Sequence, residues 1–287
     1  MPTPVSALSL QRPRTLKAAL AMLEDDPALT PIAGCTDVFV NLHFGTLENR
    51  RFVDLWGLDE LRGIRAGALG ASGASGASGA SRASIRIGAL ATYTDIIRSP
   101  LVQRRVPMLV AAAREVGGAQ IQNRGTLGGN IANASPAGDT LPVLAAAGAR
   151  VVLRSAKGER TVPFNGFYTG YRTSVRQPAE LITAVEIPPI EGRQWWRKVG
   201  TRRAQAISKV MMAGVRGRIV RVAIGSVAPT VVQATAAAEV LTKGGSIADA
   251  QTALRSEITP IDDIRSTGEY RLRVAENLLA AFWRETK

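Results

Sequence analysis

The stretch from Asn123 to Asp139 gathers small and hydrogen-bonding residues and shows neither helical nor strand periodicity. Gly128 and Gly129 have no Cβ, so the backbone there can lie directly against a ligand. Hydroxyl and amide groups accompany them at Thr126, Asn130, Asn133 and Ser135. We expect this stretch, named here the second loop, to bind a ligand rich in oxygen atoms.

Another glycine turn lies earlier in the chain, at Ile32-Ala33-Gly34-Cys35-Thr36-Asp37. It follows a short apolar segment that suits a strand, and the apolar pattern of residues 38–44 after it suits a helix. A turn between a strand and the start of a helix directs backbone N–H groups outward, where they can bind an anion. This segment, named here the first loop, is therefore a second candidate binding segment.

Neither loop matches a common phosphate-binding motif. No lysine follows Gly128-Gly129 as the pattern Gly-x4-Gly-Lys-Ser/Thr requires, and Gly-x-Gly-x-x-Gly is absent from both loops. The usual nucleotide-binding folds are therefore disfavoured. Taken alone, either loop is also compatible with an ordinary turn between packed elements.

The elements that must position the loops alternate in type over the first 175 residues. Thr15 can cap a helix with apolar residues on one face, and Thr92 with Asp95 resembles a capping box. Prolines at positions 100 and 107 should break the helical region that follows. Strands are expected at 29–32, 51–55, 61–64 and 85–90, a helix at 139–147, and a hairpin at 150–162.

Beyond Pro178 the pattern changes to four strand-like segments at 181–187, 195–199, 207–215 and 219–227. Three helical segments follow at 232–241, 247–254 and 270–283. Strands followed by helices predict an α+β fold, with one domain at 1–175 and a smaller C-terminal domain with an antiparallel sheet at 176–287. Within the first domain we expect lobes at about 1–57 and 58–175, and the Gly-Ala-Ser repeat at 70–81 should form a flexible hairpin tip.

Composition excludes several kinds of site in this chain. Cys35 is the only cysteine and His43 the only histidine, which excludes a disulfide, an iron–sulfur cluster and a thiolate zinc site made by this chain alone. We therefore expect no metal ligands. No apolar run is long enough for a membrane span and no secretory signal is evident, so we expect a cytoplasmic protein.

The chain of 287 residues carries a formal net charge of +13. Its basic residues are scattered among apolar segments and lack interleaved aromatic residues, so we expect no binding to nucleic acid. A cationic face that attracts an anionic cofactor or an acidic partner subunit explains the charge better.

Taken together, the sequence motifs of the two loops resemble those of the FAD-binding, or medium, subunit of the molybdenum hydroxylases. This is the family of xanthine dehydrogenase, carbon monoxide dehydrogenase and aldehyde oxidoreductases. The resemblance rests on Pro31-Ile-Ala-Gly-Cys-Thr-Asp37 and on Gly125-Thr-Leu-Gly-Gly-Asn-Ile-Ala-Asn-Ala-Ser-Pro-Ala-Gly-Asp139. Further matching segments lie at 87–92, 167–170, 180–188 and 198–210. The resemblance implies a two-lobed FAD-binding domain of the two-glycine-loop type, followed by the C-terminal domain.

The resemblance implies a non-covalently bound FAD whose pyrophosphate lies between the loops. It assigns cofactor binding to Ile32, Ala33, Gly34, Cys35, Thr36, Asp37, Thr126, Gly128, Gly129, Asn130, Ser135 and Asp139, and additionally to Ile182 and Lys198. Asp139 could also cap the following helix, and both roles are compatible, whereas Lys198 could instead be a solvated strand lysine. Cys35 replaces a glycine of the family, so its thiol is either a packed small group or a redox-sensitive one. No residue is assigned a catalytic role, because electron transfer itself needs no acid or base.

The resemblance also implies partner subunits. A large subunit with a molybdenum pterin would oxidise the substrate, and a small subunit with two [2Fe–2S] clusters would pass electrons to FAD in this chain. NAD, oxygen or another carrier would accept them, and a xanthine dehydrogenase-like enzyme is slightly favoured. The alternatives are a free-standing FAD-dependent oxidoreductase and a basic binding protein without a cofactor.

Overall fold

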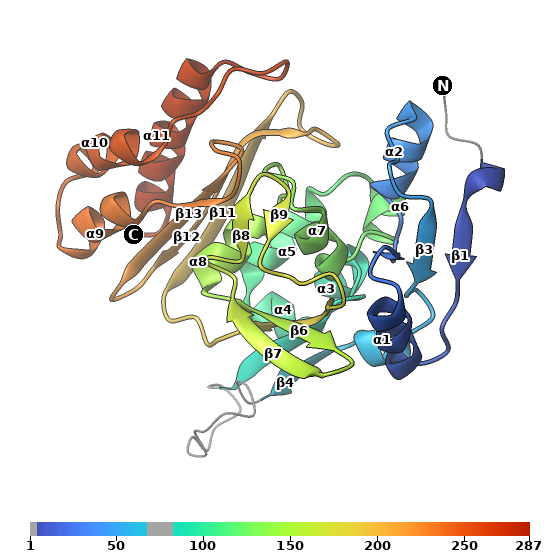
Figure 1. Ribbon diagram of the computed structural model, residues 1–287. Coiled ribbons are helices and arrows are strands. Elements are labelled where there is room, and N and C mark those ends of the chain that lie inside the picture. The colour runs from blue at the N-terminus through green and yellow to red at the C-terminus, as the bar shows by residue number, and fades with distance from the viewer. Residues whose placement is uncertain (1–4, 68–82) are drawn as a thin grey trace.

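The computed structural model describes residues 5–67 and 83–287, and the repeat at 70–81 lies outside the described residues. Three larger sheets and the helices around them make up an α+β fold, which confirms the expected class. Figure 1 shows the first sheet and α2 on one side of the molecule, the C-terminal helices on the opposite side, and the helices α3 to α8 between them.

The N-terminal lobe is built on a parallel three-stranded sheet in the order β1 (Ser9–Gln11), β3 (Arg51–Asp54), β2 (Thr30–Ile32). Parallel neighbours need crossover connections, which α1 (Leu16–Asp25) and the segment containing α2 (Val38–Phe44) provide. The side chain of Thr15 accepts a hydrogen bond from the Ala18 amide, as the cap pattern predicted. One face of α1 is buried with Val53, whereas α2 buries no residue.

The middle of the molecule is an antiparallel five-stranded sheet in the order β4-β5-β10-β6-β7. Its strands are β4 (Ile64–Gly67), β5 (Ser84–Gly88), β10 (Leu181–Ile187), β6 (Arg150–Ser155) and β7 (Gly158–Pro163). The strand expected at 61–64 starts later, because Asp59–Leu61 forms a 3-10 turn, η2. A short 3-10 turn at Val5–Ala7, η1, precedes β1, and β8 (Tyr168–Gly170) pairs with β9 (Thr173–Ser174).

Short helices pack on the apolar face of this sheet and complete the main core. They are α3 (Tyr93–Arg98), α4 (Pro100–Arg105), α5 (Pro107–Arg114), α7 (Leu127–Asn133) and α8 (Leu141–Ala147). The short helix α6 (Ala119–Gln122) lies between α5 and α7 in the chain and buries no residue. The capping box of Thr92 and Asp95 is present at α3, which confirms that prediction. Pro100 and Pro107 each begin a new helix, because proline suits a first helical turn and breaks an interior one.

Strand β10 lies at the centre of the five-stranded sheet, between β5 and β6. A boundary after residue 175 separates this strand from the sheet that it completes. We propose a boundary between Ile187 and Arg193, because that choice keeps all ladder hydrogen bonds of the sheet inside one domain.

The C-terminal sheet is antiparallel, with β11 (Arg193–Gly200), β12 (Ser208–Arg216), β13 (Val220–Gly225) and β14 (Val232–Gln233) in sequential order. Three helices cover one of its faces: α9 (Thr235–Thr242), α10 (Ile247–Glu257) and α11 (Gly268–Glu285). The helix expected from residue 232 starts later, because residues 232 and 233 pair with β13. The C-terminal sheet also contacts α5 and α8, which attaches this domain to the middle of the molecule.

Candidate functional site

The first loop connects β2 to α2 and presents free backbone donors. The amides of Gly34, Cys35 and Thr36 have no hydrogen-bond partner within the described residues. Parallel pairing of Ile32 with Asp54 and a hydrogen bond from the Leu55 amide to the Ile32 carbonyl, at 2.9 Å, hold the start of the loop. Adjacent N–H groups without partners can bind an anion, which agrees with the expectation for this loop.

Cys35 has the left-handed backbone conformation, with φ of +62°. This conformation is unfavourable for a residue with a Cβ, and it explains why a glycine suits the position in the family that the loop resembles. The Cys35 Sγ lies 3.4 Å from the Ala33 carbonyl oxygen. Partial burial and the nearby Asp54 carboxylate raise the pKa of the thiol, while Arg124 opposes the shift. A thiol with a raised pKa reacts slowly, which favours a packed small residue over a redox-sensitive group.

The second loop differs from its prediction, because it contains the helix α7 where no periodicity was expected, and α6 ends just before the loop begins. Thr126 caps α7 by accepting a hydrogen bond from the Gly129 amide at 3.0 Å. The amides of Leu127 and Gly128 donate to carbonyls at 91 and 89. The first amides of α7 are thus already paired within the protein, so this segment offers the cavity side chains and glycine surfaces rather than free N–H groups.

The two loops touch each other directly at Gly34. A Cβ built on Gly34 would lie 1.8 Å from the carbonyl oxygen of Arg124, so only glycine permits this approach of the two backbones. A second link is the hydrogen bond from Asn133 Nδ2 to Asp37 Oδ1, at 3.1 Å. The loops therefore form two walls of one site, although they are far apart in the sequence.

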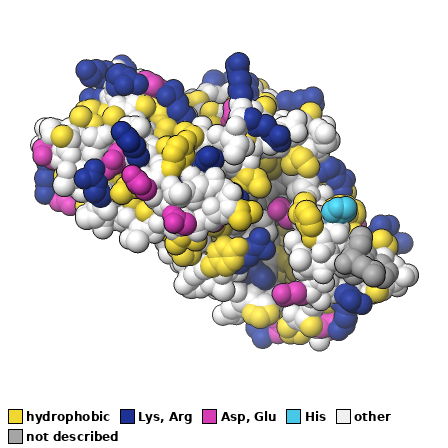
Figure 2. Space-filling model, turned by 90° about the horizontal axis from the view of Figure 1, so that it is seen from above, with side chains coloured by type: hydrophobic (Ala, Val, Ile, Leu, Met, Phe, Trp, Pro, Cys, Tyr) yellow, Lys and Arg dark blue, Asp and Glu magenta, His cyan; other side chains and the backbone are white. Residues whose placement is uncertain are grey.

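Between these walls lies a cavity of about 300 Å³, at the small end of the range for ligand pockets. Its lining includes most of the residues that the sequence assigned to cofactor binding: Ile32, Ala33, Gly34, Cys35, Thr36, Asp37, Thr126, Gly128, Gly129, Asn130 and Ile182. Figure 2 shows the surface hollowed between the lobe that carries the single histidine and the rest of the molecule. Basic side chains are spread over this face and do not gather into one patch.

The two glycines of the second loop contact different surroundings. A Cβ on Gly128 would lie 2.7 Å from the Ala89 side chain and carbonyl oxygen, so Gly128 serves close packing inside the protein. A Cβ on Gly129 would meet only one protein atom within 4 Å, Thr126 Oγ1 at 2.8 Å. Gly129 is the glycine that leaves open space at the cavity.

Ile182 lies near the start of β10, at a bulge between residues 182 and 184. Here β10 pairs with β6 on one side, whereas pairing with β5 begins only at Ala184. Ile182 lines the cavity together with Ala89 and Leu90, and the Ala89 amide donates to the carbonyl of the next strand residue, Thr183, at 3.0 Å.

Several polar residues of the cavity lining were not assigned to cofactor binding from the sequence, and Tyr93 and Arg176 are two of them. The Tyr93 side chain is buried, and its hydroxyl makes no hydrogen bond within the described residues. Burial raises the pKa of Tyr93, so the hydroxyl stays protonated and can donate a hydrogen bond. Tyr93 is the first residue of a capped helix and carries no motif that would have revealed its role.

Arg176 supplies a fixed positive charge at the cavity. Its guanidinium donates to the carbonyls of Gln177 and Glu180, at 3.0 and 2.8 Å. The neighbouring Glu180 carboxylate is already paired with Arg160, at 2.6 Å. Desolvation lowers the pKa of Arg176, but an arginine remains charged at neutral pH.

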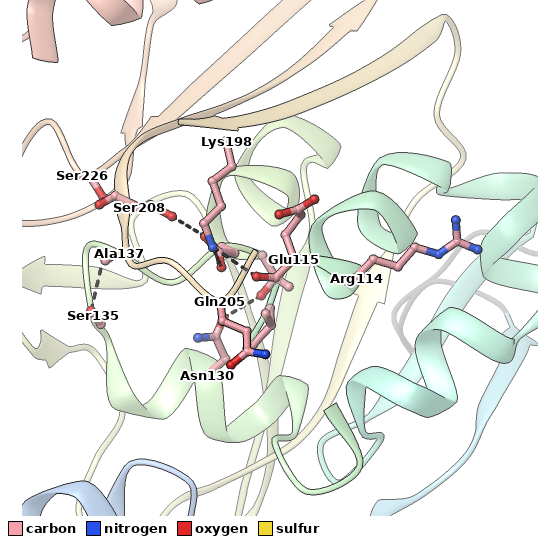
Figure 3. A network of polar contacts seen from close by, with 12 residues as sticks. Arg114, Glu115, Asn130, Ser135, Ala137, Lys198, Gln205, Ser208 and Ser226 are labelled. Carbon is pink, nitrogen blue, oxygen red and sulfur yellow. Dashed lines mark hydrogen bonds and ion pairs between the residues drawn. The ribbon is translucent and has the colours of Figure 1, made fainter. Parts of the chain in front are cut away.

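Ser135, Asp139 and Lys198 lie outside the cavity lining. Asp139 and Lys198 belong to a buried polar network, and Figure 3 shows Lys198 with Ser208 and, nearby, the partly buried Ser135. Lys198 Nζ donates to Asp139 Oδ2 at 2.7 Å and to the Glu115 carbonyl at 3.1 Å. Ser208 Oγ donates to Asp139 Oδ1 at 2.5 Å. Desolvation raises the pKa of Asp139, and the hydrogen bonds from Lys198 and Ser208 oppose the shift. The network joins the end of the second loop to β11 and β12.

Two alternatives from the sequence are wrong at this network. Lys198 is not a solvated strand lysine, because its side chain is only 6% exposed. Asp139 does not cap α8, whose N-cap is Thr140 without a side-chain hydrogen bond. Ser135 accepts a hydrogen bond from the Ala137 amide at 3.3 Å, which shapes the turn before Asp139.

Within residues 5–67 and 83–287, no group of three or more His, Cys, Asp or Glu side chains could hold a metal ion. His43 lies exposed at the last turn of α2. No helix in the described part of the chain is long and apolar enough to cross a membrane.

Comparison with known proteins gives this geometry a family. The xanthine dehydrogenase FAD-binding subunit of Escherichia coli O157:H7 is 35% identical over 181 residues, which are 63% of this chain and 58% of that subunit. The glyceraldehyde dehydrogenase medium chain of Sulfolobus acidocaldarius is 30% identical over 287 residues, covering 96% of this chain and 97% of that one. The solved structure of quinoline 2-oxidoreductase from Pseudomonas putida 86 matches with a TM-score of 0.86 at 26% identity, covering 100% of this chain and 98% of that chain.

Two family descriptions match successive parts of the chain. Residues 196–286 match the CO dehydrogenase flavoprotein C-terminal domain, and residues 6–190 match the FAD binding domain in molybdopterin dehydrogenase. All residues that line the cavity between the two loops lie within residues 6–190, the match to the FAD binding domain. The chain therefore belongs to the family of FAD-binding flavoproteins of the molybdopterin dehydrogenases.

Proposed function

We propose that this chain is the FAD-binding electron-transfer subunit of a heteromeric molybdenum hydroxylase. The observation that carries the proposal is the meeting of the two loops around one cavity, with Gly34 against the Arg124 carbonyl. Bound FAD would take up electrons from one redox partner and release them to another. The residues of this chain bind and orient the cofactor, and no acid or base is needed among them.

The cavity has the groups that a pyrophosphate requires. Free amides of the first loop form short hydrogen bonds with phosphate oxygens without burying a second charge beside them. The Arg176 guanidinium adds a positive charge, and the protonated Tyr93 hydroxyl adds a donor. The open space at Gly129 leaves room for the approach of the ligand to the backbone.

Ser135, Asp139 and Lys198 form the outer part of the proposed site. Asp139 and Lys198 hold the end of the second loop against the C-terminal sheet, and Ser135 shapes the turn before Asp139. This fixes the side of the cavity toward which a flavin ring would extend. Lys198 contacts the cofactor in this proposal only if its ion pair with Asp139 opens.

The partners in this proposal are a small subunit with two [2Fe–2S] clusters, which supplies the electrons, and a large subunit with a molybdenum pterin. The relatives support this, since they are named as medium chains or FAD-binding subunits of dehydrogenases. Their names include xanthine, glyceraldehyde and carbon monoxide as substrates, so the substrate of this enzyme is open among them. We favour a xanthine dehydrogenase-like enzyme, on the 35% identity within the matched segment. NAD, oxygen or another carrier accepts the electrons.

The decisive experiment is an absorbance spectrum of the purified chain, followed by FAD release on denaturation and quantification. We expect one FAD per chain, either as purified or after reconstitution. A folded, colourless chain that cannot be reconstituted with FAD sinks the proposal and favours a basic binding protein. Turnover of a substrate by the isolated chain favours the free-standing oxidoreductase instead.

Co-purification tests the partner assignment separately. Affinity isolation of the tagged chain from its native cell should recover a larger and a smaller subunit together with molybdenum and iron. A holoenzyme obtained in this way identifies the substrate by assay with xanthine, glyceraldehyde and carbon monoxide. A chain that carries FAD but remains a monomer at native abundance contradicts the heteromer while leaving the FAD site intact.

A further inference from the structure

Two arginines share the ring of Trp56, just outside the cavity. The guanidinium carbon of Arg124 lies 3.8 Å from the ring centroid and that of Arg62 lies 4.6 Å from it. Both distances are within the range of a cation–π interaction. Trp56 follows β3, Arg62 follows η2, and Arg124 precedes the cap of α7, so one ring joins three separate segments.

Each of these segments forms part of the cavity wall. Leu55, next to Trp56, lines the cavity, and its amide donates to the Ile32 carbonyl in the first loop. Arg62 donates to the Trp56 carbonyl at 2.5 Å and to the carbonyl of Leu90, another lining residue, at 3.5 Å. The stack therefore lies behind the wall, where it can fix the distances between its parts.

Arg124 makes the connection to the second loop. Its carbonyl oxygen is the atom against which Gly34 packs, so the position of this residue sets how closely the two loops approach. Its side chain is exposed and makes no hydrogen bond within the described residues. Among the described residues, stacking on the ring of Trp56 is thus the contact that holds the Arg124 side chain.

A second stack of an arginine on a tryptophan lies in the C-terminal domain and can serve as a control for the stack at Trp56. Arg216 lies 3.6 Å from the centroid of the Trp283 ring and donates to the Trp283 carbonyl at 2.8 Å. This repeats the geometry of Arg62 and Trp56, in which the guanidinium stacks on a ring and bonds to the carbonyl of the same residue. Neither Arg216 nor Trp283 lines the cavity.

We propose that Trp56 is a positioning residue for FAD, which holds Arg124 and Arg62 so that the two loops keep the separation that the pyrophosphate requires. This inference rests on the proposed function, because it concerns the same cavity. Trp56 acts through the loops and does not line the cavity itself.

The test measures the dissociation constant of FAD by flavin fluorescence, together with thermal unfolding of the apoprotein. We expect Trp56→Leu to weaken FAD binding about tenfold, because the variant loses two partly exposed cation–π contacts that hold the loops. Trp56→Phe keeps an aromatic ring and should bind FAD nearly as the wild type does. Trp283→Leu, the matched control, should lower the melting temperature and leave FAD affinity unchanged.

A double-mutant cycle separates positioning from simple charge attraction between Arg124 and phosphate. Trp56→Leu changes no charge, so its effect cannot come from lost attraction. If Trp56 and Arg124 act as a unit, adding Arg124→Met to Trp56→Leu weakens binding no further. Additive losses in the double variant overturn the inference.

Wild-type affinity in Trp56→Leu also overturns the inference, as does an equal loss of affinity in Trp283→Leu. Failure of the wild-type chain to bind FAD is a different result, because it removes the proposed function itself. Should Trp56→Leu not fold, Trp56→Phe and Arg124→Lys decide the question, because lysine keeps the charge and loses the planar group that stacks on the ring. The inference requires strong binding in Trp56→Phe and weakened binding in Arg124→Lys.

Discussion

The two glycine loops line the same cavity but contribute to it by opposite means. The first loop leaves its amides free at Gly34, Cys35 and Thr36, and leads into α2, which buries no residue. The second loop uses its amides at Leu127, Gly128 and Gly129 to cap and anchor α7. The first loop thus offers the cavity backbone groups without partners among the described residues, and the second offers the shape of a well-packed helix start.

This difference shows that glycines in similar sequence patterns can have unrelated roles. Gly34 permits contact between two backbones, Gly128 permits contact with Ala89, and only Gly129 leaves open space at the cavity. A rigid second loop also supports the first, since Asn133 donates to Asp37. Preorganisation of one wall lowers the entropic cost of ordering the other when the ligand binds.

The strongest test of the comparison is Gly34→Ala. The new Cβ would overlap the Arg124 carbonyl oxygen, a backbone atom that cannot move alone, so the two walls must separate. We expect loss of FAD retention and a stability loss of about 3 kcal/mol, measured by bound FAD and urea unfolding.

Gly67→Ala is the matched control, because a Cβ there meets no atom of the described residues within 4 Å. It should leave both FAD content and unfolding unchanged. Full FAD binding by Gly34→Ala would show that the loops are not held together at this contact.

Gly129→Val separates the two glycines of the second loop. A branched side chain there extends into the open space and presses on the Thr126 cap, so FAD affinity should fall at least about tenfold, with a stability loss of about 1 kcal/mol. Gly128→Ala should affect stability more than FAD affinity, with a stability loss of about 2 kcal/mol and a smaller fall in affinity than in Gly129→Val. Titration with FAD and urea unfolding measure both quantities. Normal flavin content in Gly129→Val would falsify the assignment of this glycine to the cofactor.

The smallest effect is expected for Cys35→Gly in the first loop. Glycine relieves the left-handed strain, but it also increases the entropy of the unfolded chain, so we expect a net gain of about 0.5 kcal/mol and unchanged FAD binding. Cys35→Val should destabilise instead, because a β-branched residue tolerates this conformation poorly. Denaturant unfolding and FAD titration measure both variants. Loss of FAD in Cys35→Gly contradicts the reading of the thiol as a packed group and gives it a binding role.

Local patterns in the sequence predicted much of the fold, because they depend on short-range physics. The capping box at Thr92 and the helix breaks at the two prolines follow from hydrogen bonding and φ restriction within a few residues. The helix α7 was not predicted, because a segment of seven residues with two glycines has weak helical propensity. Its capping by Thr126 and its packing against Ala89 stabilise it in the folded chain.

The sequence by itself determined the α+β class. The motifs of its two loops also determined which segments line the cavity. Tertiary structure alone decided that Tyr93 and Arg176 join them, that β10 completes the middle sheet, and that Lys198 is buried against Asp139. The same holds for the ring of Trp56 between two arginines. These contacts join residues distant in the chain, and no local propensity encodes them, because they exist only when packing brings separate elements to one place.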